Sequence, residues 1–396
     1  MFVIPDYVKI VLDKLNNAGY GAYLAGGSVR DYLMGKTPSD YDIASSAFPE
    51  ETKAVFCGFP VIETGIKHGT VTVVSNGKNI EITTFRIDGD YADGRHPKSV
   101  MFSRELSEDL KRRDFTVNAM AYSPKSGIVD LFGGKEDIKN KVIRCVGEAD
   151  RRFSEDALRI LRGLRFSSVL GFSIAPSTAK SIHKNKNLLE KISKERIFSE
   201  LKKLLCGKCA GEVLQEFSDV AKEIIPQFCE INEEKYAFIC DNIGSCGNDV
   251  KVRLSFFLSG FDEKIASDIL HTLKADNKTI SFVKNTIEAL SKPLRTKPEI
   301  KRFLRKNSYE ILSAVIKIGN LTENNSMDET KRLADEIIKN GECYLLSQLA
   351  LNGSDIISMG YTGSDTGKIL EMLFEAVITE RLENKREILQ KYIKKA

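Results

Sequence analysis

The chain has 396 residues, of which 42% are hydrophobic and 29% charged, a balance that is ordinary for a folded globular protein. A chain of this length exceeds a single compact core, so we expect roughly two to four modules. The formal net charge is only +4, so a nucleic-acid surface would have to come from local clusters of basic residues. No run of about 18 apolar residues and no signal-peptide pattern occurs, which predicts a cytoplasmic location without a membrane partner.

The first informative segment is Leu24–Asp31 (LAGGSVRD). Its pattern predicts a strand, a two-glycine turn and the start of a helix. Gly26 and Gly27 allow the backbone to approach a ligand closely, and the first N–H groups of a helix favour a phosphate. Arg30 adds a positive charge in the first turn. The segment therefore predicts a phosphate-binding turn, although neither a P-loop nor a dinucleotide fingerprint is present.

Two carboxylates follow nine residues later, at Asp40 and Asp42, in a predicted strand at Asp40–Ala44. Alternate residues of a strand point to the same face, so the two side chains would project side by side. Adjacent like charges are unfavourable unless a cation lies between them, and oxygen ligands favour Mg²⁺. Together with the glycine turn, the pair predicts a site that holds a nucleoside triphosphate and transfers its α-phosphoryl group.

A hairpin is predicted next, from β-branched runs at Val71–Val74 and Ile80–Phe85 that flank an Asn-Gly turn. Glu81 lies in the second run and is a candidate third carboxylate, with a water-facing strand glutamate as an equal alternative. The polar segment Asp88–Phe102, which contains two glycines and a proline, predicts a mobile loop.

After residue 150 the strand signals fade and apolar residues recur at helical spacing. The predicted helical segments include Asp156–Val169, Ile197–Leu205, Val250–Leu258 and Ile369–Glu380. The fold is therefore expected to be α+β, with a small mixed sheet and helices at the N-terminus followed by a long helical part. Eight scattered cysteines are interpreted as reduced thiols, and a structural zinc that uses Cys206 and Cys209 with distant cysteines is the alternative.

Asp156 and Arg159 are three residues apart, so on one helix they would share a face. Asp156 only accepts hydrogen bonds and Arg159 only donates them. Cytosine and adenine each present an amino donor beside a ring-nitrogen acceptor, whereas uracil and guanine present the reverse pattern. A fixed acceptor–donor pair would accept C and A and reject U and G. Taken alone, such a pair is more often a surface ion pair.

These motifs in this order resemble those of the class II tRNA nucleotidyltransferases, the CCA-adding enzymes and their bacterial poly(A) polymerase relatives. The resemblance covers nearly the whole chain and rests on five motifs: Ala25–Asp31 with Asp40–Asp42, Arg112–Met120, Asp130–Gly134, Glu155–Arg162 and Lys194–Leu201.

The resemblance implies four parts. These are a nucleotidyltransferase head at 1–148, a helical neck with the nucleotide-selecting motif at 149–206, a helical body at 207–290 and a helical tail at 291–396 that binds tRNA.

The resemblance also implies roles for individual residues. Asp40 and Asp42 would be catalytic and hold two Mg²⁺ ions, with Glu81 as a provisional third ligand. Asp114 and Asn118 would contact the ribose 2′-hydroxyl. The full set of implied nucleotide contacts is Gly26, Gly27, Arg30, Arg113, Asp114, Asn118, Asp156, Arg159, Arg162 and Arg165.

The implied activity is addition and repair of the 3′-terminal CCA of tRNA from CTP and ATP, without a nucleic-acid template and with release of pyrophosphate. The loop Asp88–Phe102 resembles the flexible loop of complete CCA-adding enzymes. Enzymes that add only CC, only A or a poly(A) tail stay as alternatives, as does an inactive RNA-binding protein. Lys301, Arg302 and Arg305 lie in the densest basic cluster and are candidate RNA contacts, with a solvated helix face as an equal alternative.

Overall fold

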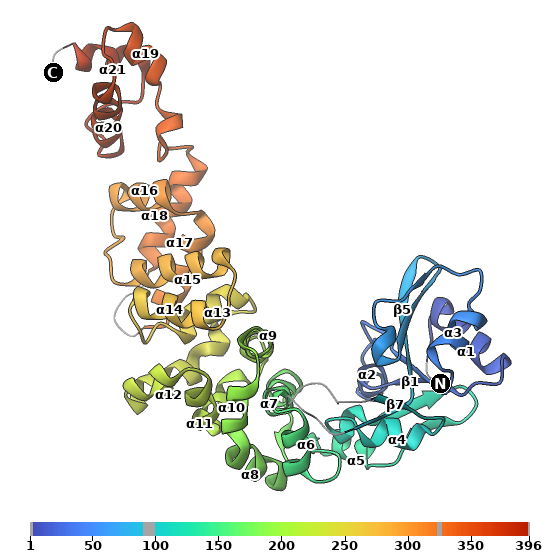
Figure 1. Cartoon of the computed structure of the whole chain (residues 1–396). Coiled ribbons are helices and arrows are strands. Elements are labelled where there is room, and N and C mark those ends of the chain that lie inside the picture. Colours follow the sequence, from blue (N-terminus) through green and yellow to red (C-terminus); the bar gives the residue numbers. More distant parts are fainter. Residues whose placement is uncertain (1–2, 90–99, 323–326, 395–396) are drawn as a thin grey trace. The chain divides into compact units, whose positions relative to one another are not determined.

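The computed structural model describes residues 3–89, 100–322 and 327–394. The chain folds into two compact units, Met1–Asn232 and Glu233–Ala396 (Figure 1). The first unit combines a sheet with helices, and the second is helical. The boundary between the units falls inside the segment predicted as the body, and the four-part division stays a prediction.

A mixed sheet forms the centre of the N-terminal part. Within the described residues it has seven strands in the order β3-β4-β5-β2-β1-β8-β9, with β2 and β5 parallel and the other neighbours antiparallel. The strands are β1 (Ala22–Ala25), β2 (Ile43–Ser45), β3 (Val61–Ile62), β4 (Thr70–Ser75), β5 (Lys78–Thr84), β8 (Met120–Ser123) and β9 (Gly127–Asp130). This sheet confirms the α+β prediction.

The predicted hairpin is β4–β5. Asn76 and Gly77 connect its strands with φ angles of 49° and 73°, the backbone conformation that favours an Asn-Gly turn. The residues 90–99 of the predicted mobile loop lie outside the described part of the chain. On either side of them, β6 (Arg86–Asp88) and β7 (Val100–Phe102) form an antiparallel pair.

One hydrophobic core joins this sheet to the first helix. Val11 and Leu15 of α1 pack in the same buried cluster as Leu24, Ile43 and Ile82 of the sheet. The helices of this part are α1 (Asp6–Asn17), α2 (Gly27–Leu33), α3 (Pro49–Val55), α4 (Leu106–Lys111) and α5 (Gly134–Lys139), with 3₁₀ turns η1 (Ile66–His68) and η2 (Thr116–Asn118). The core thus fixes β1 and β2, whose adjoining segments carry the glycine turn and the paired aspartates.

The rest of the first unit is helical apart from the short parallel pair β10 (Val142–Ile143) and β11 (Ser173–Ile174). Its helices are α6 (Ala149–Glu155), α7 (Leu158–Leu170), α8 (Pro176–Asn185), α9 (Lys194–Leu205), α10 (Ala210–Glu216) and α11 (Ser218–Ile224), with 3₁₀ turns η3 (Lys186–Lys191) and η4 (Pro226–Glu230). Helix α9 contains the predicted segment Ile197–Leu205. The predicted helix Asp156–Val169 is wrong at its start, because α7 begins at Leu158.

The second unit is built from helices. They are α12 (Glu233–Asn242), α13 (Val250–Phe257), α14 (Glu263–Thr272), α15 (Asn277–Leu290), α16 (Lys297–Lys306), α17 (Tyr309–Gly319), α18 (Asp328–Lys339), α19 (Gly353–Ser358), α20 (Ser364–Ile378) and α21 (Arg386–Ile393), with 3₁₀ turns η5 (Ile243–Cys246) and η6 (Leu346–Gln348). A separate apolar cluster that includes Leu351, Leu373 and Leu389 holds α19, α20 and α21 together. Helix α13 confirms the predicted Val250–Leu258 to within one residue. The predicted Ile369–Glu380 is wrong at its end, because α20 ends at Ile378 and Glu380 has φ 60°.

All eight cysteines are free thiols. Within the described ranges, no helix is both long and apolar enough to cross a membrane.

Candidate nucleotide-binding and catalytic site

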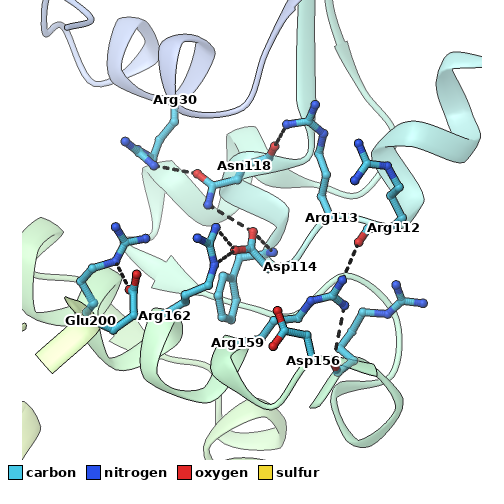
Figure 2. Close-up of polar contacts among 12 residues, drawn as sticks. Arg30, Arg112, Arg113, Asp114, Asn118, Asp156, Arg159, Arg162 and Glu200 are labelled. Atoms are coloured by element: carbon cyan, nitrogen blue, oxygen red, sulfur yellow. Dashed lines mark hydrogen bonds and ion pairs between the residues drawn. The ribbon is translucent and has the colours of Figure 1, made fainter. Parts of the chain in front are cut away.

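The ten residues predicted to contact the nucleotide all line one cleft of about 460 Å³ in the first unit. Asp42 also lines the cleft. Seven arginines and three aspartates contribute to its wall, so the cleft carries a net positive charge. Such a wall suits a ligand with several negative charges, because guanidinium groups bind phosphate oxygens in pairs. Figure 2 shows polar contacts around the cleft, including those of Arg30, Asp114, Asn118, Arg159 and Arg162.

Position 26 requires glycine for two reasons, its backbone conformation and the space beside it. Gly26 precedes α2 with φ 75° and ψ −127°, a conformation that side chains of L-residues rarely adopt. A Cβ atom at Gly26 would lie 2.8 Å from Nη1 of Arg113. The turn thus brings the backbone against an arginine of a distant motif, and only glycine fits there.

The paired aspartates lie just before β2 rather than on it. The predicted strand Asp40–Ala44 is therefore wrong at its start, since ladder pairing of β2 with β1 begins at Ile43. The backbone is nevertheless continuous with the sheet, because the Asp42 carbonyl accepts a hydrogen bond from Ala25 N–H at 3.1 Å. Asp40 and Asp42 are exposed whereas Tyr41 and Ile43 are buried. This alternation supports the prediction that the two carboxylates share one side.

Glu81 lies beside this pair. It precedes Ile82, which is in register with Ile43 in the parallel β2–β5 ladder. The pKa of Asp42 is raised, first because the surrounding protein desolvates its carboxylate and then because Glu81 and Asp40 add negative charge, while Arg113 opposes the shift. Among the described residues, no three His, Cys, Asp or Glu side chains form a group that could hold a metal.

Asp114 is the centre of a buried network. Its Oδ2 accepts hydrogen bonds from Arg162 Nε and Nη2 at 2.8 and 2.5 Å, and its Oδ1 accepts from Phe115 N–H at 2.8 Å. Burial alone would raise the pKa of Asp114, but the charge and hydrogen bonds of Arg162, helped by Arg159, lower it to about 2. Asp114 is therefore an ionised acceptor in the cleft wall.

Asn118 connects this network to α2. Its Nδ2 donates to Asp114 Oδ1 at 3.3 Å, and its Oδ1 accepts from Arg30 Nη1 at 2.7 Å (Figure 2). These two bonds fix which end of the amide faces each neighbour. Arg30 also pairs with its sequence neighbour Asp31 at 2.7 Å.

Sequence reasoning missed Asp109, which holds both arginines of the Arg112–Met120 motif. Its side chain has no exposed surface, and its oxygens lie 2.6 Å from Arg112 Nη2 and 3.0 Å from Arg113 Nη2. Burial would raise the pKa of Asp109, but the two guanidinium groups lower it. The signal was present, because an acid three and four residues before two arginines faces them on a helical turn.

The expectation that Asp156 and Arg159 lie on one helix is wrong. Asp156 is an extended residue, with φ −143° and ψ 101°, at the break between α6 and α7. Its Oδ1 accepts the Leu158 N–H at 3.1 Å, which satisfies a free donor in the first turn of α7. Both side chains nonetheless line the cleft. Sequence periodicity did not detect the break.

Arg159 is buried at 8% exposure and held from two sides. Its Nη1 lies 2.9 Å from Glu155 Oε2. Its Nη2 donates to the carbonyl of Arg112 at 3.1 Å (Figure 2). The guanidinium therefore joins α7 to the segment that follows α4.

Arg165, one of the implied nucleotide contacts, also has a protein partner. Arg165 Nε lies 2.9 Å from Oε2 of Glu200, a buried α9 residue that sequence reasoning missed. Its guanidinium lies 4.0 Å from the ring centroid of Phe166, and those of Arg30 and Arg162 each lie 5.5 Å from it. The arginines that face the cleft are thus organised before any ligand binds.

The candidate RNA contacts in the second unit also have partners. Lys301 is buried at 4% exposure and lies 2.8 Å from Glu342. Arg302 pairs with Glu375 of α20 at 2.6 Å, and Arg305 pairs with Glu371 of α20. Their positive charges are locally neutralised, and their contact with RNA stays a prediction.

Three family models match successive segments of this chain. A family model described as the poly A polymerase head domain matches residues 22–144, an RNA- and SrmB-binding model of polymerase A matches 171–230, and a tRNA nucleotidyltransferase domain 2 model matches 250–393. The CCA-adding enzyme of Ligilactobacillus salivarius is 38% identical over 99% of this chain and 97% of its own length. The chain belongs to the CCA-adding enzyme family.

Another family member, from Leuconostoc mesenteroides, is 37% identical over 97% of this chain and 94% of its own length. The crystal structure of the Bacillus stearothermophilus CCA-adding enzyme in complex with CTP has a TM-score of 0.81 and 32% identity, and the match covers 99% of this chain and 98% of that one. Membership in the CCA-adding enzyme family confirms the resemblance found in the sequence and the α+β fold.

Proposed function

We propose that this protein is a CCA-adding tRNA nucleotidyltransferase that builds and repairs the 3′ end of tRNA from CTP and ATP. One observation carries the proposal: all ten predicted nucleotide contacts and Asp42 line a single cleft rich in arginine. The chain also matches curated CCA-adding enzymes over almost its whole length. The reaction joins the tRNA 3′-hydroxyl oxygen to the α-phosphorus of the incoming nucleotide and releases pyrophosphate.

The arginines would bind the triphosphate. Arg30, Arg113, Arg162 and Arg165 come from three separate segments, and each lines the cleft. Because Asp114, Glu200 and Phe166 hold several of them in place, little side-chain entropy would be lost when the phosphates bind. This arrangement supports tight positioning of the α-phosphorus beside the paired aspartates.

The donor set at the aspartates fits a magnesium ion. Asp40 and Asp42 are both exposed on one side of an extended segment. The pKa of Asp42 is raised first by desolvation and then by the negative charges of Glu81 and Asp40, and a bound cation would offset those charges. Two carboxylates with substrate phosphates are a common magnesium ligand set. Asp40 and Asp42 would therefore be the protein ligands, since Glu81 forms no three-residue metal group with them in the described part of the chain. When bound, Mg²⁺ would lower the pKa of the attacking hydroxyl and stabilise charge on the phosphates.

Base selection would fall to Asp156 and Arg159. The carboxylate offers an acceptor to the amino group of cytosine or adenine, and the guanidinium offers a donor to the adjacent ring nitrogen. The wrong base would leave these polar groups unpaired, which is an effective basis for rejection. The buried position of Arg159 and its two partners support a fixed donor.

The deciding experiment is extension of a tRNA that ends at its discriminator base, with CTP alone, ATP alone or both. Two additions with CTP and three with both nucleotides would establish CCA addition. A single A added only to tRNA ending in CC would indicate an A-adding enzyme, and a product that stops at CC a CC-adding enzyme. A long A ladder would indicate a poly(A) polymerase.

A further inference from the structure

Arg196 lies in the first turn of α9 and lines the same cleft as Asp156. Its Nη2 donates to both carboxylate oxygens of Asp156, at 3.1 Å to Oδ2 and 3.4 Å to Oδ1. The two side chains are 23% and 17% exposed, so the contact is largely shielded from water. This contact connects α9 to Asp156, which lies in the break between α6 and α7.

The surroundings of Asp156 make this contact decisive for its orientation. Asp156 is not held by a helix, since it is the extended residue between α6 and α7. Two donors hold its carboxylate, the Leu158 N–H and the guanidinium of Arg196. A carboxylate has about four acceptor positions. The three contacts therefore leave room for one further donor, which matches the single amino group on the reading edge of cytosine or adenine.

Arg196 itself is incompletely satisfied. Its Nη1 is buried and has no hydrogen-bond partner among the described residues. An arginine that served only to stabilise the fold would be expected to use such a donor, because a buried unpaired donor is unfavourable. Local conflicts of this kind concentrate at functional sites.

We propose that Arg196 is the positioning residue for base selection: it fixes the Asp156 carboxylate as the acceptor for the amino group of the incoming base. The inference rests on the proposed function, in which Asp156 reads the base. Arg196 does not touch the reacting atoms, so its removal should affect which nucleotide is used more than how fast the correct one reacts.

The test measures kcat/KM for CTP and for UTP on the full-length protein, with tRNA that ends at the discriminator base. Arg196→Met keeps the alkyl stem but removes the donors, and Arg196→Lys restores one positive charge. Lys194→Met is the matched control, because it removes a positive charge from the same turn of α9 at a residue outside the Asp156 contacts. We expect Arg196→Met to lower the CTP:UTP ratio by about tenfold, Arg196→Lys to lie between, and Lys194→Met to keep the wild-type ratio.

Measuring the CTP:UTP ratio of Arg196→Met in an Asp156→Ala background separates the inference from the proposed function. If Arg196 acts through Asp156, adding Arg196→Met to Asp156→Ala should leave the ratio unchanged. A further fall in the ratio, or an equal loss of kcat/KM for both nucleotides in Arg196→Met alone, would overturn the positioning role.

A wild-type ratio in Asp156→Ala would instead overturn base reading by Asp156, and with it the basis of the inference. Thermal unfolding is measured for each variant. If Arg196→Met does not fold, the CTP:UTP ratio of Arg196→Lys is used in its place. A wild-type ratio in Arg196→Lys, together with a lowered ratio in Asp156→Ala, would count against the proposal.

Discussion

Asp114 and Arg162 form an ion pair across 48 residues of sequence, with both Nε and Nη2 of Arg162 bonded to the same carboxylate oxygen. Asp114 belongs to the motif that follows α4, whereas Arg162 projects from α7. The pair therefore joins the sheet-containing part of the first unit to its helical part across the cleft. Its strength depends on the ionisation of Asp114, which gives the first prediction.

Acid should weaken this link. The pKa of Asp114 is lowered from 3.8 to about 2 in the folded protein. A lowered pKa contributes stability that is present above the unfolded pKa and is lost as the pH falls towards the folded one. The shift corresponds to about 2 kcal/mol of unfolding free energy, lost between about pH 4 and pH 2. Urea unfolding between pH 6 and pH 3 should therefore show a shallower pH dependence in Asp114→Asn than in the wild type.

The exposed Asp13 of α1 supplies the control for this measurement. Asp13→Asn should retain the wild-type pH dependence, because the residue lies on the surface away from the arginine network. Identical slopes for wild type and Asp114→Asn would contradict the assigned strength of the ion pair.

Asp42→Ala should abolish nucleotide addition. The substitution removes half of the proposed magnesium ligand pair, and metal stabilisation of phosphoryl transfer contributes several kcal/mol, so we expect a loss of at least about 10³-fold in kcat. tRNA binding, followed by a gel shift, should persist. Asp13→Ala removes an exposed aspartate from the same unit and should leave turnover unchanged. Turnover that persists in Asp42→Ala would refute the catalytic role.

Gly26→Ala should impair nucleotide binding as well as stability. Gly77 provides a close comparison, because both glycines have φ near 75° but a Cβ at Gly77 meets nothing within 4 Å, whereas one at Gly26 would lie 2.8 Å from Arg113. Backbone strain should cost about 1 kcal/mol of stability in Gly77→Ala and more in Gly26→Ala, because the ψ of −127° at Gly26 lies outside the left-handed helical region. Only Gly26→Ala should also raise KM for CTP, because it displaces Arg113. Equal KM values in the two variants would show that Arg113 adjusts without consequence.

The paired state of Arg302 and Arg305 gives a test of RNA binding by the second unit. Glu371→Gln with Glu375→Gln would release both guanidinium groups from their partners. If these arginines face tRNA, affinity should rise and the slope of log K against log salt should steepen by up to about 2, since each phosphate contact contributes about 0.9. An unchanged slope would assign Arg302 and Arg305 to contacts within the unit alone.

Local motifs predicted which residues line the cleft, but not which of these side chains form hydrogen bonds and ion pairs with one another. Gly26, Arg113 and Asp156 are recognisable because short spacings carry their chemistry, and all three line the cleft. Their partners are harder to find, since Arg196 lies 40 residues from Asp156. The helical spacing of apolar residues also continues across the break at Asp156. Such a pattern therefore does not detect the break, because it depends on residue type and not on backbone angles. The early start predicted for β2 has a similar cause, since extended backbone continues where ladder pairing has ended.

The contact between Arg159 and the backbone carbonyl of Arg112 has a consequence for mutational studies. A carbonyl oxygen is present whatever side chain position 112 carries. A saturation scan at that position would therefore report on the Arg112 guanidinium, including its bond to Asp109, while the backbone anchor of Arg159 would persist in every variant. Side-chain substitutions at residue 112 would therefore not detect the hydrogen bond between Arg159 and this carbonyl. A backbone ester at residue 113 would detect it, because the ester weakens the preceding carbonyl as an acceptor.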